Sequence, residues 1–193
     1  MRKLLFIFIS LIMLAACTSD DDAIESVEES EKVKTETDFI ITEEAIKERD
    51  DFIEAYNKII DNSEESSDYI LSEDIEDPKL DSEGDAFSQT LLSKEGKSIS
   101  AVYKSDGTLN GYRTNEISEE GVPINTSFVT IQALNLDVEV YSEAYTNIML
   151  TSESLNSQTY FDNGYKIFMT YAEVDESKIF TMWVTKDSED ISK

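Results

Sequence analysis

The sequence predicts an α+β fold in a single domain, and three observations support this prediction. An apolar stripe with helical spacing runs through residues 42–62. The Asp-Gly pair at 106–107 and the Asn-Gly pair at 163–164 each separate alternating segments, which is typical of antiparallel hairpins. Helical spacing returns in residues 123–154. We therefore expect an N-terminal amphipathic helix, an antiparallel meander, a short helical pair and a C-terminal antiparallel meander, joined in one sheet.

The first helix has recognisable ends. Thr42 can cap its first turn, and Glu43 and Glu44 suit the positive end of the helix dipole. Asn62 is a plausible last residue. The apolar stripe consists of Ala45, Ile46, Phe52, Ile53, Tyr56, Ile59 and Ile60. Residues 63–85 are acidic and polar again, so they are predicted to form a long surface loop.

Residues 87–117 predict the first meander. A two-residue turn at 106–107 opposes Ala101 with Tyr112 and Tyr103 with Asn110. Strand alternation gives the meander two faces, one expected to be buried and the other exposed to solvent. The residues expected to be buried are Ile99, Ala101, Tyr103 and Tyr112, and those expected to be exposed are Ser98, Ser100, Lys104 and Arg113.

The second half repeats this logic. The helical pair is predicted to break at 135–137, between a stripe of Phe128, Ile131 and Leu134 and a stripe of Val138, Tyr141, Tyr145 and Ile148. In the last meander, two-residue turns at 163–164 and 175–176 fix the cross-strand partners. The core pairs are Tyr160 with Ile167, Ile167 with Val184, Met169 with Met182 and Tyr171 with Phe180.

The first seventeen residues predict export. Arg2 and Lys3 precede an apolar run at 4–13, which is shorter than the roughly 20 residues a membrane-spanning helix needs. Residues 14–17, Leu-Ala-Ala-Cys, resemble the lipobox of bacterial lipoproteins, in which the cysteine is lipidated and the preceding peptide is removed. The alternative is an ordinary cleaved signal peptide that happens to end near a cysteine.

The resemblance implies a diacylglyceryl anchor on Cys17, which is the only cysteine in the chain. The protein would then sit at the outer face of the cytoplasmic membrane. The resemblance and the acidic composition after Cys17 together divide the chain into a signal peptide (1–16), a lipidated cysteine with a disordered acidic tether (17–38) and an extracytoplasmic domain (39–187). In general character the chain is similar to small acidic lipoproteins of Gram-positive bacteria.

Charge and composition exclude several functions. The formal net charge of −26 is opposed to binding nucleic acid or anionic lipid headgroups, which requires clusters of Lys and Arg. The chain has no histidine, so Ser-His-Asp, Cys-His and histidine-ligated metal chemistry are excluded. No cofactor is expected. A carboxylate-dependent enzyme acting on envelope polymers remains the alternative to a binding protein.

No metal site is predicted. Asp106, Thr108, Asn110 and Gly111 match the first positions of an EF-hand loop, but the position of the bidentate glutamate falls on Ile117. A hairpin turn is the better interpretation. The acidic runs at 20–22 and 28–31 are likewise better explained as a solvated tether than as a cation site.

The last meander also predicts a candidate binding face. On the side opposite its core pairs, Phe168 falls opposite Trp183, Phe161 lies diagonal to Phe168, and Ala172 opposes Ile179. If exposed, Phe161, Phe168, Ile179 and Trp183 would form a non-catalytic surface for a protein, peptide or glycan partner at the envelope.

Three alternatives stay open. In the first, the helix at 42–62 or the helical pair at 123–154 covers this second face. In the second, a one-residue bulge shifts the register and removes the pattern. In the third, the domain is a structural spacer. The sequence leaves the oligomeric state open.

Overall fold

The computed structural model describes residues 39–62, 69–72, 74–81, 86–118, 125–150, 155–175 and 177–186. These residues belong to one compact unit. The predicted signal peptide, the predicted lipidation site Cys17 and the predicted acidic tether lie outside the described residues.

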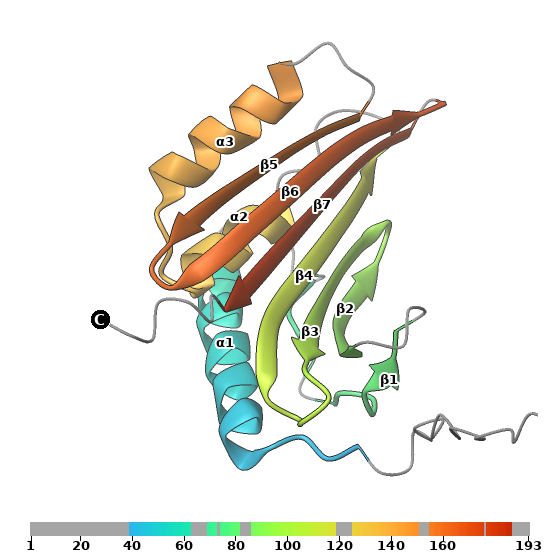
Figure 1. Ribbon diagram of the computed structural model, residues 1–193, viewed down its shortest axis with the longest axis vertical. Helices are drawn as coiled ribbons and strands as arrows, with labels where there is room; N and C mark the ends of the chain where they lie inside the picture. Colours follow the sequence, from blue (N-terminus) through green and yellow to red (C-terminus); the bar gives the residue numbers. More distant parts are fainter. Residues whose placement is uncertain are drawn as a thin grey trace, which may run out of the picture. The chain divides into compact units, whose positions relative to one another are not determined.

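The fold is α+β, as predicted, with one antiparallel sheet of seven strands (Figure 1). The helices are α1 (Glu43–Asp61), α2 (Asn125–Ala133) and α3 (Val138–Leu150). The strands are β1 (Lys79–Leu80), β2 (Phe87–Lys94), β3 (Lys97–Tyr103), β4 (Leu109–Ser118), β5 (Leu155–Asp162), β6 (Tyr165–Val174) and β7 (Ser177–Lys186). The spatial order β1-β2-β3-β4-β7-β6-β5 joins the two meanders through β4 and β7.

Helix α1 begins and ends where the sequence predicts. The Thr42 side chain accepts a hydrogen bond from the backbone N–H of Ala45, and Asn62 is the C-cap. Its apolar stripe packs on the first meander, where the ring of Phe52 stacks on the ring of Tyr112 with centroids 3.9 Å apart.

All three helices pack on the same face of the sheet. The core under α1 contains Ala101 and Tyr112, and the core under α2 and α3 contains Val184 and Ile167. The register pairs Ala101 with Tyr112, Tyr112 with Val184, and Val184 with Ile167, so these residues share one face. We call this the helix face and its reverse the open face. No helix of the described residues covers the open face, and Figure 1 shows α1 and α2 behind the strands and α3 beside β5.

The first meander contains a correction. Ala101 opposes Tyr112 as predicted, but Tyr103 opposes Leu109 rather than Asn110. A bulge between Val102 and Tyr103 adds one residue to β4, and the loop is longer than two residues, with the Lys104 N–H bonded to the Thr108 carbonyl.

The predicted surface loop at 63–85 is also partly wrong. Within it, β1 pairs with β2, and Leu71 is buried. The Asn57 side chain bonds both backbone groups of Leu71, accepting from its N–H at 2.7 Å and donating to its carbonyl at 3.1 Å. Helix α1 therefore holds this segment in place through the polar side chain of Asn57 as well as through the apolar core that Leu71 joins.

The remaining elements agree with the prediction. Helices α2 and α3 are separated at 134–137, where Asn135 has a φ of 53°. The hairpin at 163–164 has positive φ at both turn residues, which is the geometry an Asn-Gly pair favours. All predicted cross-strand pairs of the last meander are confirmed.

Candidate binding face

The register builds the open face as cross-strand rows that run across β5, β6, β7, β4, β3 and β2. One row is Thr159, Phe168, Trp183, Arg113, Ser100 and Thr90. The row on one side of it is Phe161, Lys166, Thr185, Gly111, Val102 and Ser88. On the other side follow a polar row, Ser157, Thr170, Thr181, Asn115, Ser98 and Ser93, and an apolar row, Leu155, Ala172, Ile179 and Ile117.

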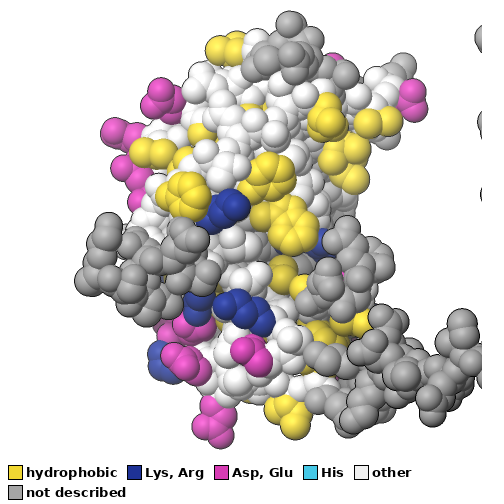
Figure 2. All heavy atoms as spheres, viewed as in Figure 1, with side chains coloured by type: hydrophobic (Ala, Val, Ile, Leu, Met, Phe, Trp, Pro, Cys, Tyr) yellow, Lys and Arg dark blue, Asp and Glu magenta, His cyan; other side chains and the backbone are white. Residues whose placement is uncertain are grey.

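The four residues predicted to form the face all lie on it. Phe168 opposes Trp183 directly, and Phe161 lies diagonal to Phe168. Phe161 is 63% exposed and Phe168 37%, while Trp183 and Ile179 are half-buried. Figure 2 shows hydrophobic side chains gathered over the strands of the last meander. The alternative in which the helices cover this face does not hold for the described helices, because all three lie on the other face.

Arg113 contributes a cation to the aromatic row. Its guanidinium carbon lies 5.0 Å from the centroid of the Trp183 ring. The Nε of Arg113 is buried and has no hydrogen-bond partner among the described residues. The positive charge lies against the indole ring, beside the exposed aromatic surface.

A shallow depression marks the centre of this surface. Its volume is about 400 Å³, and it is lined by Thr159, Lys166, Phe168, Trp183 and Thr185. The aromatic rings supply apolar area, the Lys166 ammonium supplies a positive charge, and the Thr159 hydroxyl supplies a hydrogen-bonding group. Such a combination is suited to binding, and it contains no acid or base paired for catalysis.

The open face carries no carboxylate at any described strand position. The chain has 42 Asp and Glu residues, yet the strand carboxylates Glu116, Asp162 and Glu173 all fall on the helix side of the register. Lys79, Arg113 and Lys166 are the charged residues on the open side. Around Arg113 and Lys166 this face is therefore locally positive on a strongly anionic protein, whereas at the β1 edge the Lys79 ammonium is paired with the Glu76 carboxylate at 2.8 Å.

The polar row is internally bonded. The Thr181 hydroxyl donates to the Asn115 side-chain oxygen at 3.0 Å, and the Asn115 amide donates to the Ser98 hydroxyl at 3.2 Å. These bonds cross three strands and separate the aromatic row from the apolar row. The row fixes side-chain positions on the open face without adding charge.

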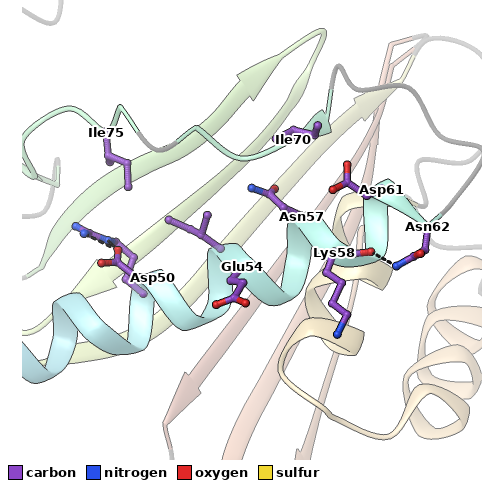
Figure 3. Close-up of a pocket in the computed structure, with 10 residues that line it drawn as sticks. Asp50, Glu54, Asn57, Lys58, Asp61, Asn62, Ile70 and Ile75 are labelled. Carbon is purple, nitrogen blue, oxygen red and sulfur yellow. Dashed lines mark hydrogen bonds and ion pairs between the residues drawn. The ribbon is translucent and has the colours of Figure 1, made fainter.

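A second cavity lies elsewhere, along α1 (Figure 3). It measures about 990 Å³ and is lined by Asp50, Glu54 and Asp61 among others. The Asp50 carboxylate accepts two hydrogen bonds from Arg49, at 2.7 and 2.9 Å. Figure 3 shows the three carboxylates spaced along the helix rather than turned toward one another. The geometry of this cavity does not build the facing acid pair that a carboxylate-dependent enzyme requires.

Glu116 is a buried carboxylate with a structural role. Its Oε1 accepts from the Thr126 hydroxyl at 2.5 Å and from the Ser127 backbone N–H and hydroxyl, both at 2.8 Å. It thereby caps the first turn of α2 from strand β4, where a negative charge meets the positive end of the helix. Burial, with the negative charge of Glu116 as a second cause, raises the pKa of Tyr141 well above its usual value.

The described residues contain no group of acidic side chains arranged to hold a metal ion. Asp106, the first residue of the EF-hand-like pattern, instead accepts from the N–H and hydroxyl of Thr108 in a turn. These bonds lower the pKa of the Asp106 carboxyl. In the same part of the chain no helix is long and apolar enough to cross a membrane.

Sequence reasoning missed two residues of this face. Arg113 was expected on a wet face, but its contact with Trp183 depends on the pairing of β4 with β7, which local patterns do not specify. Lys166 was detectable, because the turn at 163–164 places it opposite Phe161. Compared with known proteins, the chain matches no family model, no curated protein and no solved structure.

Proposed function

We propose that this chain is a lipid-anchored, extracytoplasmic, non-catalytic binding module that holds an envelope partner on its open face. The lipobox-like residues 14–17 support the anchor on Cys17. The surface formed by Phe161, Phe168 and Trp183, with Ile179 in the neighbouring apolar row, supports the binding role.

A single observation carries the proposal. On a chain of net charge −26, the open face combines exposed aromatic rings with the cations Arg113 and Lys166 and lacks carboxylates in its described strands. Acidic residues elsewhere keep the protein soluble and repel other anionic surfaces. A region without them can be desolvated by a partner at low cost, because no unpaired carboxylate becomes buried.

The test measures Trp183 directly, since it is the only tryptophan. We expect acrylamide to quench its fluorescence, and we expect an envelope ligand to protect it. The probes are purified cell-wall polysaccharide and an envelope protein fraction, and anionic vesicles, which the acidic chain should repel, are the negative control. When the protein is immobilised, Trp183→Ala should abolish its retention of the ligand that the wild type binds, while its far-UV circular dichroism stays unchanged.

The matched control is Thr90→Ala, because Thr90 lies exposed in the same row at its far end. Equal retention by the wild type and Trp183→Ala, or emission that acrylamide cannot quench, would contradict the proposed binding face.

A further inference from the structure

The sheet ends on one side in strand β5, which pairs with β6 alone among the described strands. The strand has eight residues, and its register with β6 runs without a bulge from Leu155 to Asp162. By contrast, the β2–β3 and β3–β4 ladders both contain a register shift. The free edge of β5 is therefore long and regular.

Natural sheets protect such edges with short edge strands, lysine, proline, bulges or a covering helix or loop. Helix α3 packs on the helix side of β5, where the Asn156 side chain donates to the Ile148 carbonyl at 3.3 Å, but the strand itself has few of the other devices. The opposite edge uses two of them, since β1 has only two residues and one is Lys79. Strand β5, Leu-Asn-Ser-Gln-Thr-Tyr-Phe-Asp, contains neither lysine nor proline.

The backbone groups on this edge belong to the residues that face the open side. The two-residue hairpin makes Asp162 and Tyr165 a hydrogen-bonded pair. Alternation along the ladder then turns the N–H and C=O groups of Phe161, Thr159 and Ser157 away from β6.

The most exposed apolar side chains of the open face lie on this edge. Leu155 and Phe161 on β5 are 65% and 63% exposed, against 53% for Val174 and 37% for Phe168 on β6 and 48% for Ile117 on β4. Trp183 lies one strand further in than Phe168 and is less exposed than these side chains, because strands flank it on both sides. One added strand would cover both Leu155 and Phe161.

We propose that the partner binds as an extended peptide that adds a strand to the free edge of β5. This rests on the proposed function and names its ligand class. Main-chain hydrogen bonds to Ser157, Thr159 and Phe161 supply affinity, and apolar side chains at alternate peptide positions pack on Leu155 and Phe161.

Charge decides which peptide fits and disfavours a second copy of the chain. Each copy carries −26, so two copies repel each other. At the hairpin end of β5, the Asp162 carboxylate accepts from the backbone N–H of Asp137 at 2.5 Å, which brings two acidic residues together. The Asp137 side chain also caps α3 by accepting from the N–H of Glu139. The cation Lys166, opposite Phe161, lies on β6 and thus on the inner side of β5. The peptide on the outer side is therefore apolar at alternate positions and basic at the end beside Asp162.

The test uses the full chain in detergent and two labelled nine-residue peptides. In both, valine alternates with threonine. One carries two lysines at its N-terminus and the other at its C-terminus, so that either strand direction is sampled. We expect one peptide to bind and to slow amide hydrogen exchange at Thr159 at least tenfold. N-methylation of its alternate amides should remove binding.

Two variants test the edge. Thr159→Pro removes an outward N–H without touching the β5–β6 ladder, and Phe161→Lys places a charge on the edge. Each should weaken peptide binding at least tenfold, while Thr90→Lys, on the far side of the open face, leaves it unchanged. Circular dichroism confirms folding, and Phe161→Lys decides alone if Thr159→Pro does not fold.

Three results would overturn the inference. Neither peptide binds the wild type at about 1 mM. Binding persists in Thr159→Pro and Phe161→Lys but is lost in Trp183→Ala, which leaves the proposed function standing without strand addition. The wild type sediments as a dimer that Phe161→Lys dissociates, which assigns the edge to a second copy.

Discussion

The guanidinium of Arg113 on β4 lies over the indole ring of Trp183 on β7, 5.0 Å from its centroid. The two residues are direct cross-strand partners, so the contact spans the junction between the two meanders. A cation held over an aromatic face contributes about 0.5–2 kcal/mol, with the larger values in desolvated sites.

We expect Arg113→Ala to lower the free energy of unfolding by about 1 kcal/mol and to shift the Trp183 emission to the red. Urea denaturation followed by fluorescence checks both effects. Lys166→Ala is the control, because Lys166 is exposed and its removal should change stability by less than about 0.5 kcal/mol. Equal effects of the two substitutions would contradict a specific contact.

Glu116→Ala should lower the free energy of unfolding by about 3 kcal/mol, because the hydroxyls of Thr126 and Ser127 and one N–H lose their acceptor in a buried site. Glu116→Gln keeps one acceptor oxygen and should cost about 1 kcal/mol. Urea denaturation measures both. A gain in stability with Gln would indicate that the charge of Glu116 is a net cost.

Gly111→Ala should prevent the β4–β7 junction from forming normally. Gly111 has a φ of 152°, and an added Cβ would collide with the carbonyl oxygen of Val184. We expect a loss of about 3 kcal/mol or more, or failure to fold. Gly164→Ala is the matched control, since it also has positive φ but no atom lies within 4 Å of an added Cβ. Its cost should stay near about 1 kcal/mol.

Stability should fall in alkali because of Tyr112. Burial raises its pKa far above the usual value near 10, and the negative charge it would acquire is further disfavoured by neighbouring Tyr165, Tyr103 and Glu48. Because the folded-state pKa is raised, the stabilisation is fully present below pH 10 and is lost as the pH rises toward the folded-state pKa.

The expected slope is about 1.4 kcal/mol per pH unit above pH 10 for this one group. Urea denaturation at pH 8, 10 and 11 measures it. Tyr112→Phe keeps the stacking on Phe52 and should make the decline shallower by that amount. An identical decline in the wild type and the variant would assign the alkaline loss to other groups.

The parts of the fold that depend on local chemistry could be predicted from sequence. Thr42 caps α1, and the Asn-Gly pair at 163–164 sets the register of β5 and β6. From that register the opposition of Phe168 and Trp183 follows by counting. The aromatic part of the candidate face could therefore be predicted from the sequence alone.

The parts that depend on long-range packing could not be predicted. The bulge opposite Val102 arises where Gly111 must pass close to Val184, which is distant in sequence. The sequence did not indicate that Glu116 caps a helix, because a buried glutamate on a strand cannot be distinguished by sequence from the other acidic residues among the 42 in the chain. Long-range packing likewise decides which side of the sheet the helices cover and which side remains open.

The order of the strands has a consequence for how the chain folds. Within β2–β4 and within β5–β7, each strand pairs with its neighbour in sequence, so these contacts close short loops at small entropic cost. Among the strands that the structure describes, β4 and β7 alone pair across a long interval, from Gly111 to Thr185. The sheet thus consists of two locally encoded halves, and the encounter of β4 with β7 is the high-contact-order event that should set the folding rate.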